Sequence, residues 1–477
     1  MKIKLFTLLT ILAIALAGIA PSPAVAQAYN TSFTTSITYQ NVDTVATSSL
    51  QIHFYASPTT TTPITINRPN LPAGAGTSVF LGSLSEIDGN FRGSAIMTSD
   101  RLLVATLVQV PQSDVVRNRP LSNGFFNGAP QALIATVLKN TFNTNSVFSV
   151  QNTDSEVNNI TIRFYNTSAT LVHTMTADLQ PGASTQVDAG QVAELGASFN
   201  GAAVVTARRA GATTDNGNIV ATSLELSTNA TAASAFEGVT EGAQTIYMAS
   251  ALCNAFGGYN SSYAIQNTNL STATNVTVAY SNGATETKNI GPGAKQSFIT
   301  CEASGMASDF SGSATITSTA TDVVAIGKVF GLGVSSAFLG DFSGSPRLAL
   351  PYVRWSQTQY ETGARQRAFI AIQNVGGAQI PANALRILYK DKDGATVVTH
   401  TFNQAIGVGA KVNSNPFING DAAAAEFGYY TDGTFGGSAV IECTAPSCEV
   451  VAVVRVQSRV PAAGQTVGED YNGIPIP

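Results

Sequence analysis

Residues that could perform chemistry are few in this chain of 477 residues and lie far apart in the sequence. Each of the three histidines, His53, His173 and His400, occupies a strand-like segment in a different part of the chain. A Ser-His-Asp or Cys-His catalytic set needs its members within hydrogen-bonding reach of one another, so this spacing indicates no such set. Paired carboxylates for glycoside hydrolysis depend on the fold rather than on spacing, which leaves a secreted hydrolase as the third possible function.

The four cysteines form two local groups. Cys253 and Cys301 lie in one region, whereas Cys443 and Cys448 flank Thr444 to Ser447, a segment typical of a hairpin loop. In an exported chain four cysteines are expected to pair, and three connectivities are available. We predict one disulfide within each group. A zinc site is the alternative, but the sequence lacks the CxxC spacing and the nearby histidine that such sites use.

One cluster of aromatic and basic residues suggests a binding site. The single tryptophan, Trp355, lies near Arg354, Tyr360, Arg365 and Arg367. An aromatic face can stack on a sugar ring while a guanidinium donates hydrogen bonds, so these residues could bind a glycan or an anionic polymer. The alternative is a tryptophan in the core beside a solvated basic strand. We expect no cofactor and no metal site.

The N-terminus has the features of a secretory signal peptide. Lys2 and Lys4 precede an apolar run from Leu5 to Ile19, and a small-residue cleavage site ends at Ala26. The alternative is a membrane anchor, but the run is short for a helix that crosses a bilayer. We expect a secreted chain with no membrane span after cleavage, associated with a cell surface.

Composition argues against nucleic acid as a partner. Loss of Lys2 and Lys4 with the leader gives a formal charge of 22 − 29 = −7, and nucleic-acid binding depends on clustered cations. Charged residues make up 11% of the chain, well below the ~25% of ordinary soluble domains. Such a surface suits a protein that packs against itself, but we favour the simpler interpretation of a secreted all-β protein.

The chain contains four copies of one unit. Gln-Asn recurs at Gln40, Gln151, Gln266 and Gln373, with periods of 111, 115 and 107 residues. These periods exceed those of solenoid repeats and match whole domains of ~100 residues. A second signature of Phe-x-Gly-Ser/Ala-Ala trails each copy, and a Pro-Gly or Gly-x-Gly turn lies between the two. Four small modules favour spacing or multivalent attachment over catalysis.

Each unit alternates apolar and polar residues with period two. In the second copy, Val147 to Gln151 and Ile160 to Tyr165 both alternate, and Pro181-Gly182 marks a reversal. Six or seven short strands per unit predict an all-β chain of four tandem immunoglobulin-like antiparallel β-sandwich domains after the signal peptide. The predicted boundaries are 1–26 for the signal peptide, 27–120, 121–232, 233–338 and 339–465 for the repeats, and 466–477 for a junction-like tail.

The first half of each repeat resembles the CARDB-type adhesion-related sandwich domains of bacterial surface proteins. In copy two the resemblance rests on Val150 to Thr153, Asn159 to Tyr165 and Leu179 to Ser184, and copy three matches in the same way. The resemblance implies a surface or extracellular setting.

We expect aromatic-x-Gly segments at Phe126, Phe236, Phe342 and Tyr471 to join the repeats. This composition predicts tight joints with buried rings, hence a semi-rigid rod. The last segment marks either a lost fifth repeat or a tail that docks on another molecule. We therefore expect a non-catalytic structural or adhesive protein of the surface or extracellular matrix, whose partners are surface or matrix proteins or further copies of itself. A carbohydrate-binding protein with its site in repeat four is the alternative.

Overall fold

The computed structural model describes residues 32–56, 62–112, 118–228, 232–357, 365–417, 426–430, 436–460 and 465–477. The predicted signal peptide and Tyr360 lie outside these ranges. The described residues form β-strands with a few short 3-10 turns, and the strands pair in antiparallel sheets. The predicted all-β class is therefore confirmed.

The first two repeats each contain two sheets. Repeat 1 has the sheets β4-β1-β6-β7 and β3-β2-β5, from β1 (Phe33–Asn41), β2 (Leu50–Ala56), β3 (Ile64–Asn67), β4 (Gly76–Phe80), η1 (Leu81–Ser83), β5 (Gly93–Ser99), β6 (Leu103–Pro111) and β7 (Leu121–Asn123). Repeat 2 has the sheets β12-β9-β14-β15 and β11-β10-β13-β8, from β8 (Gln131–Lys139), β9 (Thr144–Asn152), β10 (Asn158–Asn166), β11 (Leu171–Leu179), β12 (Ser184–Asp188), η2 (Ala189–Gln191), η3 (Ala193–Leu195), β13 (Phe199–Arg209), β14 (Ile219–Ser227) and β15 (Ala233–Glu237).

The last two repeats follow the same plan. Repeat 3 has the sheets β20-β17-β22-β23 and β16-β21-β18-β19, from β16 (Thr245–Cys253), β17 (Asn260–Asn267), β18 (Thr274–Tyr280), β19 (Thr285–Ile290), β20 (Lys295–Ile299), η4 (Thr300–Glu302), β21 (Phe310–Ser318), β22 (Val323–Gly331) and β23 (Val334–Leu339). Repeat 4 has the sheets β25-β26-β31-β32 and β28-β27-β30-β24-β33, with β29 paired to β26, from β24 (Arg347–Leu350), β25 (Trp355–Ser356), β26 (Arg365–Asn374), β27 (Leu385–Lys390), β28 (Thr396–Thr401), β29 (Lys411–Ser414), β30 (Ser438–Cys443), β31 (Val450–Val460), β32 (Gln465–Asn472) and β33 (Ile474–Pro475).

Alternation along the strands builds the cores. In β10 the side chains of Ile160, Ile162 and Phe164 are buried, whereas Thr161 and Arg163 between them remain partly exposed. Successive side chains of a strand point to opposite faces of the sheet, so the period-two pattern places one row inside. The two sheets of a repeat close over this row as a sandwich-like pair.

The asparagine of each Gln-Asn motif fastens a turn inside its own repeat. Asn41, Asn152, Asn267 and Asn374 are fully or almost fully buried. Each donates through Nδ2 to backbone carbonyls of the turn, for example to Leu179 O at 2.9 Å and to Ile406 O at 3.0 Å. Each also accepts, through Oδ1, the backbone N–H two residues later. A buried amide needs such partners, so the motif has a structural role in every repeat.

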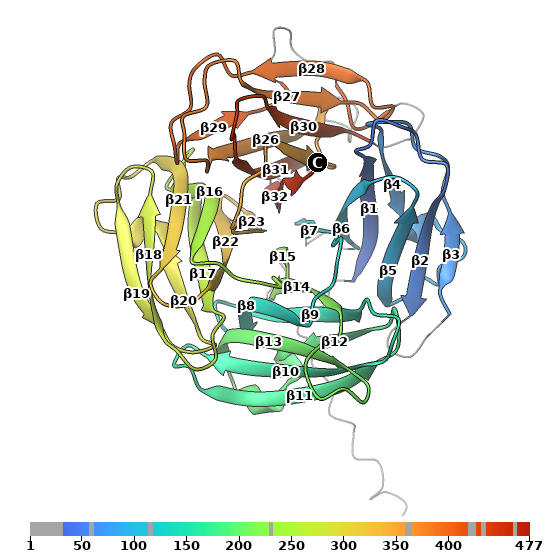
Figure 1. The fold of residues 1–477 in the computed structure, drawn as a ribbon, viewed down its shortest axis with the longest axis vertical. Helices are drawn as coiled ribbons and strands as arrows, with labels where there is room; N and C mark the ends of the chain where they lie inside the picture. Colours follow the sequence, from blue (N-terminus) through green and yellow to red (C-terminus); the bar gives the residue numbers. More distant parts are fainter. Residues whose placement is uncertain are drawn as a thin grey trace, which may run out of the picture.

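The four repeats form a closed ring rather than a rod (Figure 1). The final strand of each repeat, β7, β15, β23 or β32, lies nearest the centre. Each of these strands contacts the next, and β32 contacts β7. The rod prediction is therefore wrong. The junction composition indicated tight joints, but it did not indicate the direction in which each joint turns the chain.

The predicted repeat boundaries also need correction. Each of the four falls beside or inside a final strand: three of them separate β7, β15 or nearly all of β32 from its own sheet, and the fourth cuts Leu339 from the end of β23. Residues 466–477 are thus no separate tail, because β32 pairs with β31 along Val453–Val460. These strands are rich in Ser, Ala, Asn and Gly, a composition that resembles a linker more than a core strand.

The aromatic-x-Gly segments do not all occupy equivalent places in their repeats. Gly124, Gly238, Gly340 and Gly473 occupy equivalent places, since each donates its N–H to an alanine carbonyl of the preceding strand. Phe126 and Phe342 lie beyond this point and are 56% and 45% exposed, whereas Phe236 lies before it and is 1% exposed. The prediction of a buried ring at every joint therefore holds for Phe236 alone of these three.

The C-terminal segment docks in the same molecule. Ile474 lies opposite Ala349 of β24, as Val239 lies opposite Leu133 and Asp341 opposite Tyr247 at two earlier joints. Ile474 and Ile476 then pack against Val104 of repeat 1. This segment follows the path of a joint and closes the ring without a covalent link.

Candidate functional site

The contacts between repeats use the repeated sequence signatures. The serine of the Phe-x-Gly-Ser-Ala signature reaches the turn of the following repeat: Ser94 Oγ donates to Gly182 O at 2.7 Å, and Ser313 Oγ donates to Gly409 O at 2.8 Å. Repeat 2 has Ala202 at this position, and there Gln296 Nε2 of repeat 3 donates to Thr167 O at 3.3 Å. Signature and turn therefore serve as the two halves of one interface.

The same turn of repeat 1 lies against repeat 4. Gly394 has φ +86°, and a Cβ built on it would come 2.4 Å from Ala73 O. Gly74 is close enough that its Cβ would lie 3.3 Å from Lys390 Nζ. Glycine meets both requirements here, because it adopts positive φ and allows close backbone approach. At this fourth interface, too, the turn of one repeat therefore lies against the preceding repeat.

Polar side chains join the final strands at the centre of the ring. Asn472 of β32 accepts the N–H of Leu339 at 2.8 Å and donates to Leu339 O and to Asp341 Oδ2, each at 2.9 Å. Asn123 of β7 donates through Nδ2 to Asn472 O at 3.0 Å, and its backbone N–H donates to the carboxylate of Glu237. We call Asn123, Glu237, Asp341 and Asn472, together with Arg119, Glu469, Arg455 and Asp470, the central seam.

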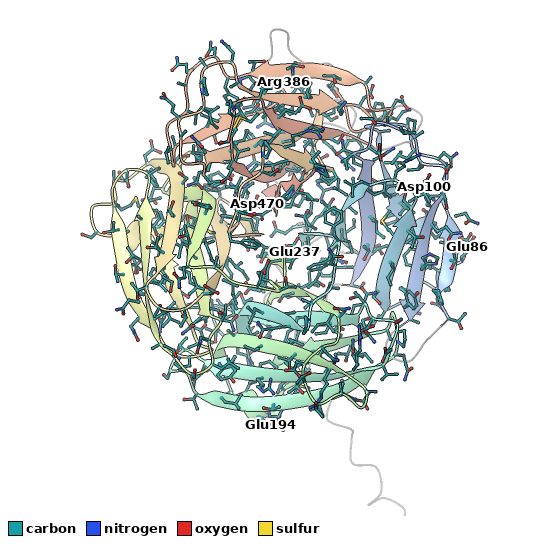
Figure 2. All side chains as sticks on the ribbon, viewed as in Figure 1. Glu86, Asp100, Glu194, Glu237, Arg386 and Asp470 are labelled. Carbon is teal, nitrogen blue, oxygen red and sulfur yellow. A yellow bond between two sulfur atoms is a disulfide. The ribbon has the colours of Figure 1, made fainter. Side chains whose placement is uncertain are left out.

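Buried ion pairs reinforce the seam. Arg119 of repeat 1 pairs with Glu469 of repeat 4 and also donates to Ser458 Oγ at 2.8 Å. Arg455 pairs with Asp470 at 2.6 Å, and Asp470 accepts a hydrogen bond from Ser336 of repeat 3 at 2.8 Å. Figure 2 shows Glu237 and Asp470 near the centre and Glu86, Glu194 and Arg386 at the periphery.

Burial shifts the pKa of several groups between the repeats. Desolvation raises the pKa of Glu237 to about 7 and that of Asp341 to about 8, although hydrogen bonds from Asn123 and Asn472 oppose the shift. Desolvation lowers the pKa of Lys295 to about 7, helped by the nearby charge of Lys328. Removing a charge from water disfavours the ionised form in each case. These groups therefore titrate near neutral pH.

Little open space remains between the final strands. A shallow hollow lined by residues of β7, β15, β23 and β32 has almost no room for a water molecule. The described seam residues can therefore hold four repeats together, and the space between these strands is too small for a substrate.

The predicted glycan-binding residues of repeat 4 are brought together with their aromatic faces covered. Trp355 is 9% exposed, and the guanidinium of Arg367 lies 5.2 Å from its ring and 4.3 Å from that of Phe417. Arg354 is buried, with its guanidinium 4.4 Å from the Tyr352 ring. Arg365 is half-buried at the start of β26, and Tyr360 lies outside the described residues. This geometry favours the alternative of a core tryptophan.

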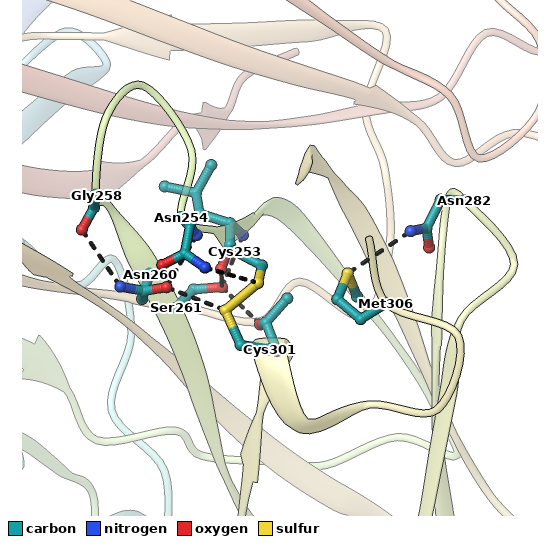
Figure 3. The surroundings of a disulfide bond; sticks show 10 residues. Cys253, Asn254, Gly258, Asn260, Ser261, Asn282, Cys301 and Met306 are labelled. Atoms are coloured by element: carbon teal, nitrogen blue, oxygen red, sulfur yellow. Dashed lines mark hydrogen bonds between the residues drawn. A yellow bond between two sulfur atoms is a disulfide. The ribbon is translucent and has the colours of Figure 1, made fainter. Parts of the chain in front are cut away.

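The cysteines pair within their repeats, as the sequence predicts. Cys253 at the end of β16 bonds Cys301 in η4, with 5.0 Å between the Cα atoms (Figure 3). Cys443 bonds Cys448 across the loop between β30 and β31. Disulfides are typical of proteins that fold in an oxidising compartment.

Sequence reasoning missed the seam residues. Glu237 is a carboxylate in β15, whose other residues are small or apolar, and Glu469 and Asp470 lie in β32; both strands adjoin aromatic-x-Gly segments. A carboxylate in such a strand was a usable signal, because acidic side chains are rarely buried without partners. Arg119 gave no comparable signal, since its partner Glu469 lies 350 residues away.

Across the described part of the chain, no group of three or more His, Cys, Asp or Glu residues could hold a metal ion. None of the helical segments that the structure describes has the length and apolar character needed to cross a bilayer.

Comparisons with known proteins give little information. No family model and no curated protein matches the chain. A solved structure described as the crystal structure of a tetra-tandem repeat in the extending region of a large adhesion protein shares 10% identity, over 91% of this chain and 94% of that chain. Its TM-score is 0.11, so the two chains do not superpose and the likeness supports no conclusion about fold or function.

Proposed function

We propose that this chain is an exported, non-catalytic structural or adhesive protein of the cell surface or extracellular matrix. Its four repeats are immunoglobulin-like sandwiches arranged as a compact ring, and its partners are surface or matrix proteins. The signal-like N-terminus and the two disulfides support export.

One observation carries the proposal. The residues of the repeated signatures are used inside the protein, since the four asparagines fasten turns and Ser94, Ser313 and the turn glycines form contacts between repeats. An enzyme usually gathers its special residues in one pocket, with a few polar groups that converge on a substrate. Here the repeated residues are distributed around the ring, which is the pattern expected of a scaffold.

The low charge of the chain fits the same role. At 11% charged residues the surface carries few groups that repel a neighbouring macromolecule. Such a surface favours close packing in a crowded layer outside the cell.

The test has two parts. Immunogold labelling of the cells that make the protein should place it on the outer surface or in the surrounding matrix, and a deletion strain should adhere or aggregate less until the purified ring is added back. Label confined to the cytoplasm would overturn export. Unchanged adhesion and aggregation in the deletion strain would overturn the structural or adhesive role.

A further inference from the structure

Within the described residues, which begin at position 32, repeat 1 has no counterpart of the strand with which the other repeats begin. In repeats 2, 3 and 4 this first strand, β8, β16 or β24, pairs with β13, β21 or β30. The equivalent strand of repeat 1 is β5, which in the described part of the chain has a strand neighbour on one side alone, β2. No strand among the described residues therefore occupies the outer backbone edge of β5.

The missing strand leaves core-facing apolar residues partly uncovered. Ala95 and Met97 lie opposite the buried Phe54 and Ile52, and both are half-buried. Their equivalents are fully or almost fully buried: Ala203 and Val205, Ala314 and Ile316, and Ala439 and Ile441. Leu103, Ala105 and Leu107 on the facing strand β6 are also half-buried, unlike Ile219, Ala221 and Ser223 in repeat 2.

The face of repeat 2 that lies toward repeat 1 is also incompletely covered. In repeats 3 and 4, β22 and β31 present apolar residues to the first strand of the preceding repeat, and Val324, Ile326, Val451 and Val453 are buried there. In repeat 2 the corresponding residues of β14 are Val220, Thr222 and Leu224, and the last two remain half-buried. The hydrophobic cores of repeats 2, 3 and 4 each include residues of a neighbour, whereas the described core of repeat 1 includes none.

The three existing first strands show what would fill the place. Ile134, Met248 and Leu350 lie opposite the alanine of the signature, and Ala132, Ile246 and Leu348 lie two residues earlier. The occupant is therefore an extended segment with apolar side chains at alternate positions, a large one opposite Ala95 and another opposite Met97. Adding a strand to an open sheet edge is an established mode of peptide recognition.

The chain's own upstream sequence suits this place poorly. Leu350 precedes Asn374 by 24 residues, and the same offset from Asn41 gives 41 − 24 = 17, which is Ala17 in the apolar run of the predicted signal peptide. Ile134 precedes Asn152 by 18 residues and Met248 precedes Asn267 by 19, which give 41 − 18 = 23 and 41 − 19 = 22. These positions are Pro23 and Ser22, in the sequence Pro21-Ser22-Pro23. Proline has no N–H to donate, so it is unsuited to a paired strand.

A second whole copy is also a poor occupant. Repeats 1 and 2 already touch at one end of β5, where Ser94 bonds to Gly182 and a Cβ on Gly182 would meet the Tyr55 ring. A second repeat pairing along β5 would have to displace this contact, whereas a single strand would not.

We propose that β5 of repeat 1 accepts an extended, alternately apolar segment of a partner protein as an added antiparallel strand, between repeats 1 and 2. The partner would supply to repeat 1 what β8, β16 and β24 supply within the other repeats. An open sheet edge beside uncovered apolar side chains is otherwise a site of unspecific aggregation, which gives a reason for it to be capped. This inference concerns the kind of partner and does not depend on where the protein acts.

A peptide with the sequence of β8, Gln131–Lys139, serves as the probe. Added to the chain beginning at Gln27, it should bind saturably and slow hydrogen exchange of the β5 amides at least about tenfold, with little change in β13, β21 and β30. A peptide with Ile134→Asp should not bind. Absence of binding, or protection elsewhere than β5, would overturn the proposal.

Two variants of the chain test whether the added strand covers the core-facing side chains of β5. Met97→Lys places an ammonium group where the added strand must cover an apolar surface, so it should weaken peptide binding at least about tenfold. Thr98→Lys, one residue along on the exposed face, should bind like the parent. Equal binding by both variants would overturn the assignment of the core-facing side.

A second copy of the chain or the chain's own upstream segment would each change the hydrogen exchange of β5 when no peptide is present. If hydrogen exchange of the β5 amides slows as the protein concentration rises, a second copy of the chain occupies the edge of β5. If exchange at β5 is slow at all concentrations in the chain that keeps residues 1–26, but not in the chain that begins at Gln27, the upstream segment occupies the edge. Either result would overturn the partner strand.

Discussion

The interface between repeats 1 and 2 differs from that between repeats 2 and 3, although a short joint of the same kind links each pair. Between repeats 2 and 3, β8 lies against β17 and β22, and Val324, Ile326 and Ala337 enter the core of repeat 2. Between repeats 1 and 2 the part of the chain that the structure describes contains no first strand to play this part, and Thr222 and Leu224 stay half-buried. The strand that begins a repeat is thus what joins it to the next.

Chain connectivity and packing do not coincide in this ring. Repeats 4 and 1 have no covalent link, yet Val108 and Leu121 of repeat 1 belong to the core of repeat 4. Arg119 and Glu469 also pair there. We therefore expect substitutions between repeats 4 and 1 to cost more stability than substitutions between repeats 1 and 2.

The largest expected effect is at the ring closure. Arg119→Ala leaves Glu469 as a buried carboxylate without its cation, and breaking a buried pair in this way typically costs about 3–5 kcal/mol. Urea unfolding should show a loss of that size, and small-angle scattering should show a larger particle as the ring opens. Arg101→Ala, at a partly exposed pair with Asp100, is the matched control and should change neither. A loss in Arg119→Ala no greater than in the control would contradict the importance of the closure.

The next effect concerns pH and the interface between repeats 1 and 2. The pKa of Glu237 is raised by burial, so its stabilising contribution is complete below pH 4.5 and is lost as pH rises to about 7. The loss amounts to at most about 3.5 kcal/mol, for a pKa shift of about 2.5 at about 1.4 kcal/mol per pKa unit. Glu237→Gln, which keeps an acceptor for Asn123 but cannot ionise, should flatten the decline in melting temperature between pH 4.5 and 7.

Glu86→Gln at an exposed position controls for the change in net charge and should keep the parent's decline. An unchanged slope in Glu237→Gln would show that this carboxylate does not govern the pH dependence.

A reciprocal exchange isolates the apolar contact itself. Ile326 is fully buried between repeats 2 and 3, and Thr222 occupies the equivalent place between repeats 1 and 2. Ile326→Thr removes buried apolar surface and introduces a hydroxyl, so it should cost about 2 kcal/mol. Thr222→Ile should have almost no effect, because its site is not closed. Equal costs in chemical denaturation would mean that the two interfaces are packed alike.

The smallest expected effect is at the serine contacts. Ser313 is buried, and its hydroxyl bonds to Gly409 O between repeats 3 and 4. Ser313→Ala should cost about 1 kcal/mol, the usual net value of such a bond. Ser94 makes the same contact with Gly182 at a half-buried position, so Ser94→Ala should cost less. The reverse order in thermal unfolding would contradict the comparison.

Much of the local structure follows from residues that are close in sequence. The alternation Ile160-Thr161-Ile162-Arg163-Phe164 predicts β10, and the two cysteine pairs appear where their local grouping places them. The Gln-Asn spacing identifies four repeats, although it does not indicate that Asn152 and its equivalents fasten a turn. That role depends on which carbonyls the turn brings to the buried amide.

The candidate site was less predictable than the strands. The sequence shows Trp355 and the nearby arginines as one cluster. Whether the aromatic faces are open or covered depends on Phe417, which is distant in sequence. The central seam was not recognised at all. Its partners, such as Ser336 and Asp470, meet because four strands from four repeats converge on one centre.

The sequence carries the strand pattern, the four repeats, the turns and the cysteine pairs, because each depends on side-chain alternation or on the geometry of a few neighbouring residues. The ring and the uncovered edge of β5 depend on the angle at each joint. An angle results from docking one repeat on the next, where Ser94 meets Gly182 and Val108 enters a core more than 200 residues away. No local pattern encodes such contacts, so a chain that reads as a linear array closes on itself.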